Sequence, residues 1–226
     1  MKIGVFGTGS VGRALAARLA QLKHEVMIGT RDPARTRGRS EPDAMGNPPF
    51  SVWLAQNSSV KLGSLPEAAA HGELLVNASL GSASLEVLEK AGEAGLNGKV
   101  LVDISNPLDF SGGMPPTLFV KDSDSLAEQI QRAFPRVKVV KTLNTVNALL
   151  MVEPGRLAGG EHSVFLSGND ARAKATVAEL LRGFGWKDIV DLGDITTARG
   201  TEMLLPLWLR LYGALNTPLF SFKVVR

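Results

Sequence analysis

Three glycines near the start of the chain, Gly7, Gly9 and Gly12, are spaced for phosphate binding. They follow an apolar run at residues 2–6 and precede a helix-forming run at residues 11–23. In such a strand–turn–helix unit the first glycine permits a tight turn. The second lets a pyrophosphate approach the backbone, and the third lets the helix pack on the strand. The helix N-terminus then offers free N–H groups and the positive end of its dipole to phosphates. The spacing therefore predicts a dinucleotide-binding site.

The end of the second predicted strand indicates which dinucleotide binds. A NAD site ordinarily has an acidic residue there, which accepts a hydrogen bond from the ribose 2′-hydroxyl. In this chain the strand at 25–29 leads instead into Thr30 and Arg31. A hydroxyl and a guanidinium suit a 2′-phosphate, because arginine offers paired donors in phosphate geometry. With Arg35 as a second cation, the segment favours NADP, and Asp32 is interpreted as a turn cap.

A cluster of four arginines, Arg31, Arg35, Arg37 and Arg39, accounts for much of the formal net charge of +3. Clustered arginines are one signature of nucleic-acid binding. This cluster, however, follows the second strand of a dinucleotide unit. A small phosphate is therefore the favoured partner, and no nucleic acid is expected.

The composition excludes several kinds of site. The 226 residues include no cysteine, which excludes disulfides, thiolate catalysis and cysteine zinc sites. His24, His71 and His162 are scattered without metal-ligand spacing, so no metal site is predicted. No apolar run approaches the roughly 20 residues that span a bilayer. The first strand begins almost at the N-terminus, which leaves no room for a signal peptide. We therefore expect a cytoplasmic protein with no membrane partner.

The elements that must position these residues follow an alternating pattern. Apolar strand-like runs alternate with helical ones, which is typical of a parallel sheet with crossover helices. The pattern predicts an α/β fold, a Rossmann doubly wound and mostly parallel sheet, over residues 1–147. Residues 148–226 are predicted as a small C-terminal α/β unit. In the first part, strands are expected at 2–6, 25–29, 59–62, 73–78, 99–104 and 137–142, and helices at 11–23, 50–56, 65–71, 83–94 and 124–133.

Shorter elements are predicted beyond residue 147. Asn169 is expected to cap a helix over 170–184, and Pro206 to kink or break a long helix over 196–212. That long helix is apolar nearly all round, so we expect it to be buried, either within its own domain or in a dimer interface. A homodimer is favoured. The remaining strands are expected at 163–167, 189–192 and 220–225.

Two segments are predicted as loops. Residues 31–49 are rich in Arg, Pro and Gly. Residues 109–116 follow the carboxyl end of the strand at 99–104, and ligands in open α/β sheets bind outside such strand ends. The glycines of this second loop would let it move as a lid over the site. The alternative is a passive surface connection.

Motifs along the whole chain share the pattern of a known family. They begin with Thr30-Arg31 and continue with Asp-Ile-Ser-Asn-Pro-Leu at 103–108 and Val-Lys-Thr-Leu-Asn-Thr-Val at 140–146. Further matches lie at 168–174, 191–193 and 197–199. In these segments the chain resembles the NADPH-dependent coenzyme F420 reductases, also called F420-dependent NADP oxidoreductases.

The resemblance implies hydride transfer between the nicotinamide of NADP(H) and a deazaflavin, coenzyme F420. A flavin, FMN or FAD, is the alternative acceptor, because the same fold occurs in flavin-linked ferric reductases. Both reactive atoms belong to cofactors, so no side chain need act as acid or base, and no catalytic residue is expected. Catalysis would depend on holding two flat rings face to face.

The resemblance also implies which residues hold the cofactor. Ala78, Ser79 and Leu80 would lie along the nicotinamide ribose, and Leu80 would cover one face of the ring. Asn106 and Asn144 would lie near the nicotinamide; the alternatives are a turn residue and a strand terminator. The implied cofactor-binding residues are Gly7, Thr8, Gly9, Ser10, Val11, Gly12, Thr30, Arg31, Arg35, Ala78, Ser79, Leu80, Asn106 and Asn144.

The second ring would face the start of the last long helix, within a C-terminal unit that binds the acceptor and dimerises. Thr196, Thr197 and Arg199 lie there by resemblance, and a helix N-terminus with an arginine suits an anionic tail. The alternative for Arg199 is an ion pair with Glu202 or Asp194. The segments at 33–49 and 109–116 are longer than the family pattern, which leaves the acceptor open.

The sequence therefore predicts an NADPH-dependent oxidoreductase that reduces or oxidises a small-molecule redox acceptor. A sensor that binds NADPH without turnover is the alternative, because its binding residues would be the same. A β-hydroxyacid or imine reductase is a further alternative. Those enzymes usually add a larger helical domain, and many need a catalytic Lys or Asp that the sequence does not identify.

Overall fold

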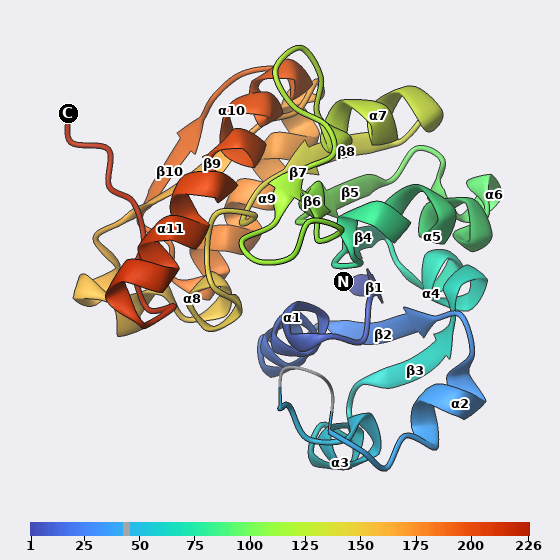
Figure 1. Cartoon of the computed structure of the whole chain (residues 1–226). Coiled ribbons are helices and arrows are strands. Elements are labelled where there is room, and N and C mark those ends of the chain that lie inside the picture. The colour runs from blue at the N-terminus through green and yellow to red at the C-terminus, as the bar shows by residue number, and fades with distance from the viewer. Residues whose placement is uncertain (43–45) are drawn as a thin grey trace.

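Six parallel strands form a central sheet in the order β3-β2-β1-β4-β5-β8 (Figure 1). The computed structural model describes residues 1–42 and 46–226. The order is that of a Rossmann sheet, and all six strands predicted for the first part of the chain are present. The strands are β1 (Lys2–Phe6), β2 (Glu25–Thr30), β3 (Lys61–Ser64), β4 (Leu74–Asn77), β5 (Val100–Asp103) and β8 (Lys138–Lys141).

Helices cover both faces of this sheet, as crossover connections between parallel strands require. One face carries α1 (Ser10–Gln21), α3 (Phe50–Gln56), α8 (Ala148–Val152) and α9 (Ala171–Phe184). The other carries α4 (Leu65–His71), α5 (Ser84–Ala91), α6 (Glu93–Leu96) and α7 (Leu126–Ala133). Because both faces are covered, the inner strands β4 and β5 are apolar up to their last residues, Asn77 and Asp103. All four residues of β4 are buried.

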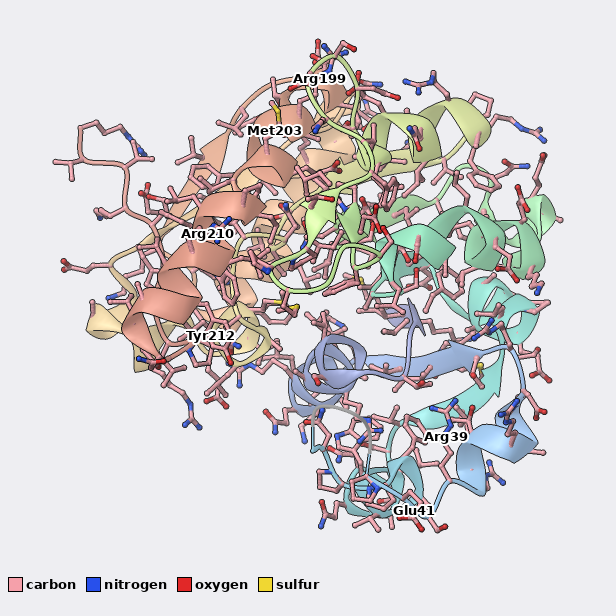
Figure 2. The ribbon with its side chains drawn as sticks, in the orientation of Figure 1. Arg39, Glu41, Arg199, Met203, Arg210 and Tyr212 are labelled. Carbon is pink, nitrogen blue, oxygen red and sulfur yellow. The ribbon has the colours of Figure 1, made fainter. Side chains whose placement is uncertain are left out.

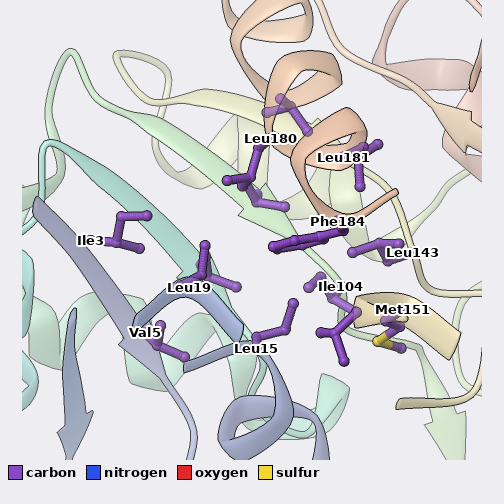
Figure 3. Packing of buried hydrophobic residues seen from close by; sticks show 14 of the residues in the cluster. Ile3, Val5, Leu15, Leu19, Ile104, Leu143, Met151, Leu180, Leu181 and Phe184 are labelled. Atoms are coloured by element: carbon purple, nitrogen blue, oxygen red, sulfur yellow. The ribbon is translucent and has the colours of Figure 1, made fainter. Parts of the chain in front are cut away.

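The C-terminal part adds two parallel strands, β9 (Ser163–Leu166) and β10 (Asp188–Asp191). It joins the main sheet through an antiparallel bridge between Lys141 and Ser167. A single hydrophobic cluster extends from β1 and α1 to α9, where Leu15, Leu143 and Phe184 lie together (Figure 3). The predicted boundary at residue 147 therefore falls inside a shared core, and it stays a prediction.

Several local expectations were wrong. Asp170, one residue beyond Asn169, caps α9 by accepting from the Ala173 amide at 2.8 Å. The segment 220–225 is not a strand, although the Ser163 amide donates to the Phe222 carbonyl at 2.8 Å. The predicted loop at 31–49 contains a short helix, α2 (Pro33–Arg37). The predicted helix at 83–94 ends at Ala91, because Gly92 leaves the helical conformation with φ of 85° and ψ of 131°.

The loop predicted at 109–116 connects two short antiparallel strands, β6 (Leu108–Asp109) and β7 (Thr117–Leu118). Its tip carries two exposed apolar side chains, Phe110 and Met114. The hairpin follows β5 beyond the carboxyl end of that strand, which is where the predicted lid would lie. Movement of this hairpin as a lid stays a prediction.

The last predicted helix is divided in two, α10 (Ala198–Met203) and α11 (Leu205–Leu215), with Pro206 in the first turn of α11. The break at the proline is confirmed. Burial of the whole helix within the chain was wrong, because Leu205 is the one buried residue of α11. Apolar side chains of and just beyond α11, among them Leu207, Leu215 and Leu219, are about half exposed.

No helix in the described parts of the chain, residues 1–42 and 46–226, is long and apolar enough to cross a membrane.

Candidate functional site

The glycine loop has the geometry that its spacing predicts. Gly7 has a φ of +130°, and a Cβ there would lie 2.4 Å from the Ala78 carbonyl oxygen. A Cβ at Gly12 would lie 2.2 Å from the Gly7 carbonyl oxygen, so α1 packs closely on the turn. A Cβ at Gly9 would meet no protein atom within 4 Å. The open space at Gly9, beside the N-terminus of α1, is where a pyrophosphate would approach the backbone.

Arg13, which belongs to none of the predicted binding residues, joins the glycine loop to the segment before α3. Its buried side chain donates from Nε to the Thr8 carbonyl at 2.8 Å and from Nη1 to the Pro48 carbonyl. The guanidinium also lies 5.3 Å from the centre of the Phe50 ring. Asn47 donates to the Ser10 hydroxyl at 2.7 Å. The segment before α3 therefore folds over the start of α1. Nothing in the local sequence pattern indicates this long-range contact.

At the end of β2, Thr30 and the first arginines lie where the sequence places them. The Thr30 hydroxyl lies 3.0 Å from the Thr36 hydroxyl, and the side chains of Arg31 and Arg35 are exposed. Asp32 accepts from the Arg35 amide at 2.8 Å and caps α2, which confirms its interpretation as a turn cap. The guanidinium groups of Arg31 and Arg35 are therefore accessible at the end of β2, as the binding of a 2′-phosphate would require.

The carboxyl end of β4 turns back sharply towards the following loop. The Ser79 hydroxyl donates to the Asn77 side chain at 2.6 Å, and Leu80 is 74% exposed. A Cβ at Gly81 would lie only 1.8 Å from the Asn106 carbonyl oxygen. Glycine at position 81 is therefore required for the β4 turn to approach the turn after β5. The sequence analysis missed this glycine, which belongs to no motif.

Asn106 and Asn144 form a mutual amide pair. Asn106 Nδ2 donates to the Asn144 carbonyl at 3.0 Å, and Asn144 Nδ2 donates to Asn106 Oδ1 at 3.1 Å. Asn144 Nδ2 also donates to the Thr201 carbonyl in α10 at 3.0 Å. The structure thus brings the two asparagines together and joins them to α10. Their direct contact with a nicotinamide stays a prediction.

A buried ionic cluster, which the sequence analysis missed, lies at the end of β8. Lys141 Nζ lies 2.9 Å from Asp103 Oδ2 and 2.8 Å from Glu202 Oε1, and all three side chains are almost completely buried. Burial alone would lower the pKa of Lys141, but the two carboxylates outweigh it and raise the pKa. The lysine is therefore held in its charged form. Its one local signal is a charged residue directly after the apolar pair Val139-Val140.

The three residues predicted to face a second ring use their side chains within the protein. Arg199 forms a bidentate ion pair with Glu128 of α7, at 2.8 and 2.6 Å. Its predicted partners, Glu202 and Asp194, were wrong, because Glu128 of α7 lies within reach of the guanidinium. The hydrogen bond from Arg199 lowers the pKa of Glu128. The hydroxyls of Thr196 and Thr197 donate to Asp194 and Ser167.

The groups along this edge of the sheet are hydroxyls, amides, arginines and apolar side chains. They are suited to binding phosphates and an aromatic ring. Among residues 1–42 and 46–226, no group of three His, Asp or Glu side chains could hold a metal ion. The arrangement can position a dinucleotide, with its phosphates at the glycine loop and the other end towards the amide pair.

Comparison with known proteins identifies relatives with the same architecture. A family described as NADP oxidoreductase, coenzyme F420-dependent, matches residues 2–107. A solved structure from Arthrobacter sp. FB24, provisionally assigned as an F420-dependent NADP reductase, is 62% identical. It covers 100% of both chains with a TM-score of 0.97. The F420-dependent NADP reductase of Methanocaldococcus jannaschii is 27% identical, over 93% of this chain and 92% of its own.

A second kind of relative is a larger protein. Metalloreductase STEAP3 of Rattus norvegicus is 30% identical over 211 residues. The match covers 92% of this chain but only 38% of the length of STEAP3.

Proposed function

The chain belongs to the coenzyme F420-dependent NADP oxidoreductase family, and on this basis we propose that it transfers hydride between NADP(H) and a deazaflavin or flavin acceptor. It is an NADP-dependent oxidoreductase. Coenzyme F420 is the first candidate acceptor, because the Methanocaldococcus jannaschii relative is an F420-dependent NADP reductase that matches over most of both chains.

The observation that carries the proposal is the chemistry of the amide pair and its surroundings. Asn106 and Asn144 lie at the carboxyl ends of the strands, and the lysine behind them is buried and paired with two carboxylates. A buried, charged lysine with three partners cannot accept a proton from a substrate. Direct transfer between two cofactor rings needs no such group. The protein's part is then to hold the rings in contact.

The dinucleotide would lie across the glycine loop. The pyrophosphate would bind at the N-terminus of α1, beside the open space at Gly9. The 2′-phosphate would contact Thr30, Arg31 and Arg35, whose arginine side chains are exposed. The nicotinamide would lie between the turn at 78–80 and the amide pair.

The acceptor would lie over the nicotinamide, against the exposed apolar side chains of this edge. Leu80 and the hairpin residues Phe110 and Met114 are each more than half exposed. Exposed apolar side chains that gather over a site favour a flat aromatic ligand. Leu80, Phe110 and Met114 would contact a deazaflavin and a flavin in the same way.

The function is tested by following NADPH oxidation with F420, FMN, FAD and no acceptor. We expect turnover with at least one of the three, and F420 to give the highest kcat/KM. Tight NADPH binding without oxidation by any acceptor would instead support the sensor. The binding measurement on the same sample separates that outcome from an inactive preparation.

We also propose that the protein is a homodimer that pairs through α11. Leu207 and Leu215 are each about half exposed, and the Trp208 indole N–H is buried without a hydrogen-bond acceptor. Met203, Arg210 and Tyr212 follow one another along α10 and α11 (Figure 2). An apolar helix face of this kind suits burial against a second copy.

The Leu215→Glu variant is expected to be monomeric in sedimentation velocity at micromolar concentration, whereas the unaltered protein is dimeric. A buried glutamate on each side of the interface would be unpaired, which opposes association. Val52→Glu is the matched control, since Val52 is an exposed apolar residue of α3. A monomeric unaltered protein, or an equal effect of both variants, would contradict pairing through α11.

A further inference from the structure

Lys141 connects three elements of the molecule through a single ammonium group. Its Nζ donates to Asp103 at the end of β5, to Glu202 in α10, and to the Ser105 carbonyl. An ammonium has three donors, and each has a protein acceptor here. The position of Lys141 is therefore fixed, because any displacement would leave a buried charge or a buried donor unpaired.

On one side, the cluster holds the turn that carries Asn106. Asp103 Oδ1 accepts from the Ser105 hydroxyl at 2.7 Å and from Asn77 at 2.9 Å. Lys141 holds the Ser105 carbonyl, and Ser105 directly precedes Asn106. Ser105, which sets the position of Asn106, is therefore held through both its hydroxyl and its carbonyl group.

On the other side, the cluster holds α10. Glu202 accepts from the Leu126 amide at 2.8 Å and from the Ala127 amide at 3.1 Å, at the N-terminus of α7. The residue before Glu202, Thr201, accepts from Asn144 at 3.0 Å. The same ionic cluster thus holds both sides of the amide pair. It binds the turn that carries Asn106, and it binds α10, whose Thr201 carbonyl accepts from Asn144.

We propose that Lys141 is a positioning residue for the nicotinamide half of the dinucleotide, acting through the Asn106–Asn144 pair. The inference rests on the proposed function insofar as it takes NADP(H) to be the ligand. The Lys141 side chain has no accessible surface, so its effect on a ligand would pass through the residues that it holds. It would have no part in binding the adenosine half, which we expect at Thr30 and Arg31.

The test compares two ligands that differ in the nicotinamide half. The double variant Lys141→Met/Asp103→Asn removes one positive and one negative charge, so the net charge of the cluster is unchanged and Glu202 keeps its amide partners on α7. Calorimetry then gives Kd for NADPH and for adenosine 2′,5′-bisphosphate, which lacks the nicotinamide. We expect NADPH to bind about tenfold more weakly. The Kd of the bisphosphate should change less than about twofold, because its site is distant.

Lys174→Met is the matched control. Lys174 also pairs with an aspartate, Asp191 at 2.7 Å, but in the C-terminal part, where the aspartate is 53% exposed. It should leave both Kd values unchanged. If the double variant does not fold, Glu202→Gln, which keeps the lysine and its other two acceptors, should raise the NADPH Kd alone to a smaller extent.

Equal weakening of both ligands would overturn the proposal, because it would indicate a general structural role. No change in either Kd would overturn it as well. These binding measurements do not depend on turnover. A protein that binds NADPH in this selective manner but oxidises it with no acceptor would retain the positioning role and lose the proposed function.

Discussion

Replacing Gly12 with alanine is expected to lower the free energy of unfolding by about 3 kcal/mol. The new Cβ would lie 2.2 Å from the Gly7 carbonyl oxygen, and this neighbour is backbone that cannot rotate away. Relief requires α1 to move from β1, which disrupts the cluster around Leu15 and Leu19. Urea unfolding followed by circular dichroism measures the loss.

Gly9→Ala is the matched control for this effect. A Cβ at Gly9 meets no protein atom within 4 Å, and its φ of −78° is open to alanine. Stability should therefore change by less than about 0.5 kcal/mol. The same methyl group occupies the space of the pyrophosphate, so NADPH binding should be lost. A stable Gly12→Ala protein, or a Gly9→Ala protein with normal affinity for NADPH, would contradict the roles assigned to the two glycines.

Arg31→Ala is expected to raise the Kd for NADPH by roughly 10- to 100-fold, because a charged hydrogen bond to phosphate contributes about 1.5–3 kcal/mol. The Kd for NADH, which lacks the 2′-phosphate, should be nearly unchanged. Fluorescence titration of both dinucleotides measures the difference. Arg35→Ala should act in the same direction and to a lesser extent, since Arg35 lies within α2, farther along the chain from the end of β2 than Arg31.

Arg37→Ala controls for the loss of a positive charge near the site. Arg37 is exposed and lies at the end of α2, beyond the residues assigned to the phosphate. If Arg37→Ala raised the NADPH Kd as much as Arg31→Ala, the arginines would act by long-range attraction and not by a direct contact with the 2′-phosphate. An Arg31→Ala protein with unchanged NADPH affinity would place the 2′-phosphate elsewhere.

The parallel sheet could be predicted because its strands carry their own signal. A strand buried on both faces is mostly apolar, so runs such as Leu74, Leu75 and Val76 stand out from the amphipathic helices between them. The glycine loop could be predicted for a similar reason. Two of its glycines meet a local backbone requirement: Gly7 has a positive φ, and Gly12 is closely approached by the Gly7 carbonyl.

The contacts between distant segments could not be predicted in this way. The partner of Arg199 is Glu128 rather than its near neighbours in sequence, because the packing of α7 on α10 decides which carboxylate is in reach. The exposure of α11 is a similar case. Its composition indicates a buried helix, whereas burial depends on what lies against it.

The ionic cluster of Asp103, Lys141 and Glu202 also constrains how this sequence can diverge. Loss of Lys141 alone leaves the carboxylates of Asp103 and Glu202 uncompensated in the interior, at a cost of about 3–5 kcal/mol. That is a large part of the roughly 5–15 kcal/mol by which a domain is stable. A substitution of Lys141 alone would therefore remove much of the stability of the fold and be selected against. Among descendants of this chain, the three positions should be inherited as one unit or be replaced together by apolar residues.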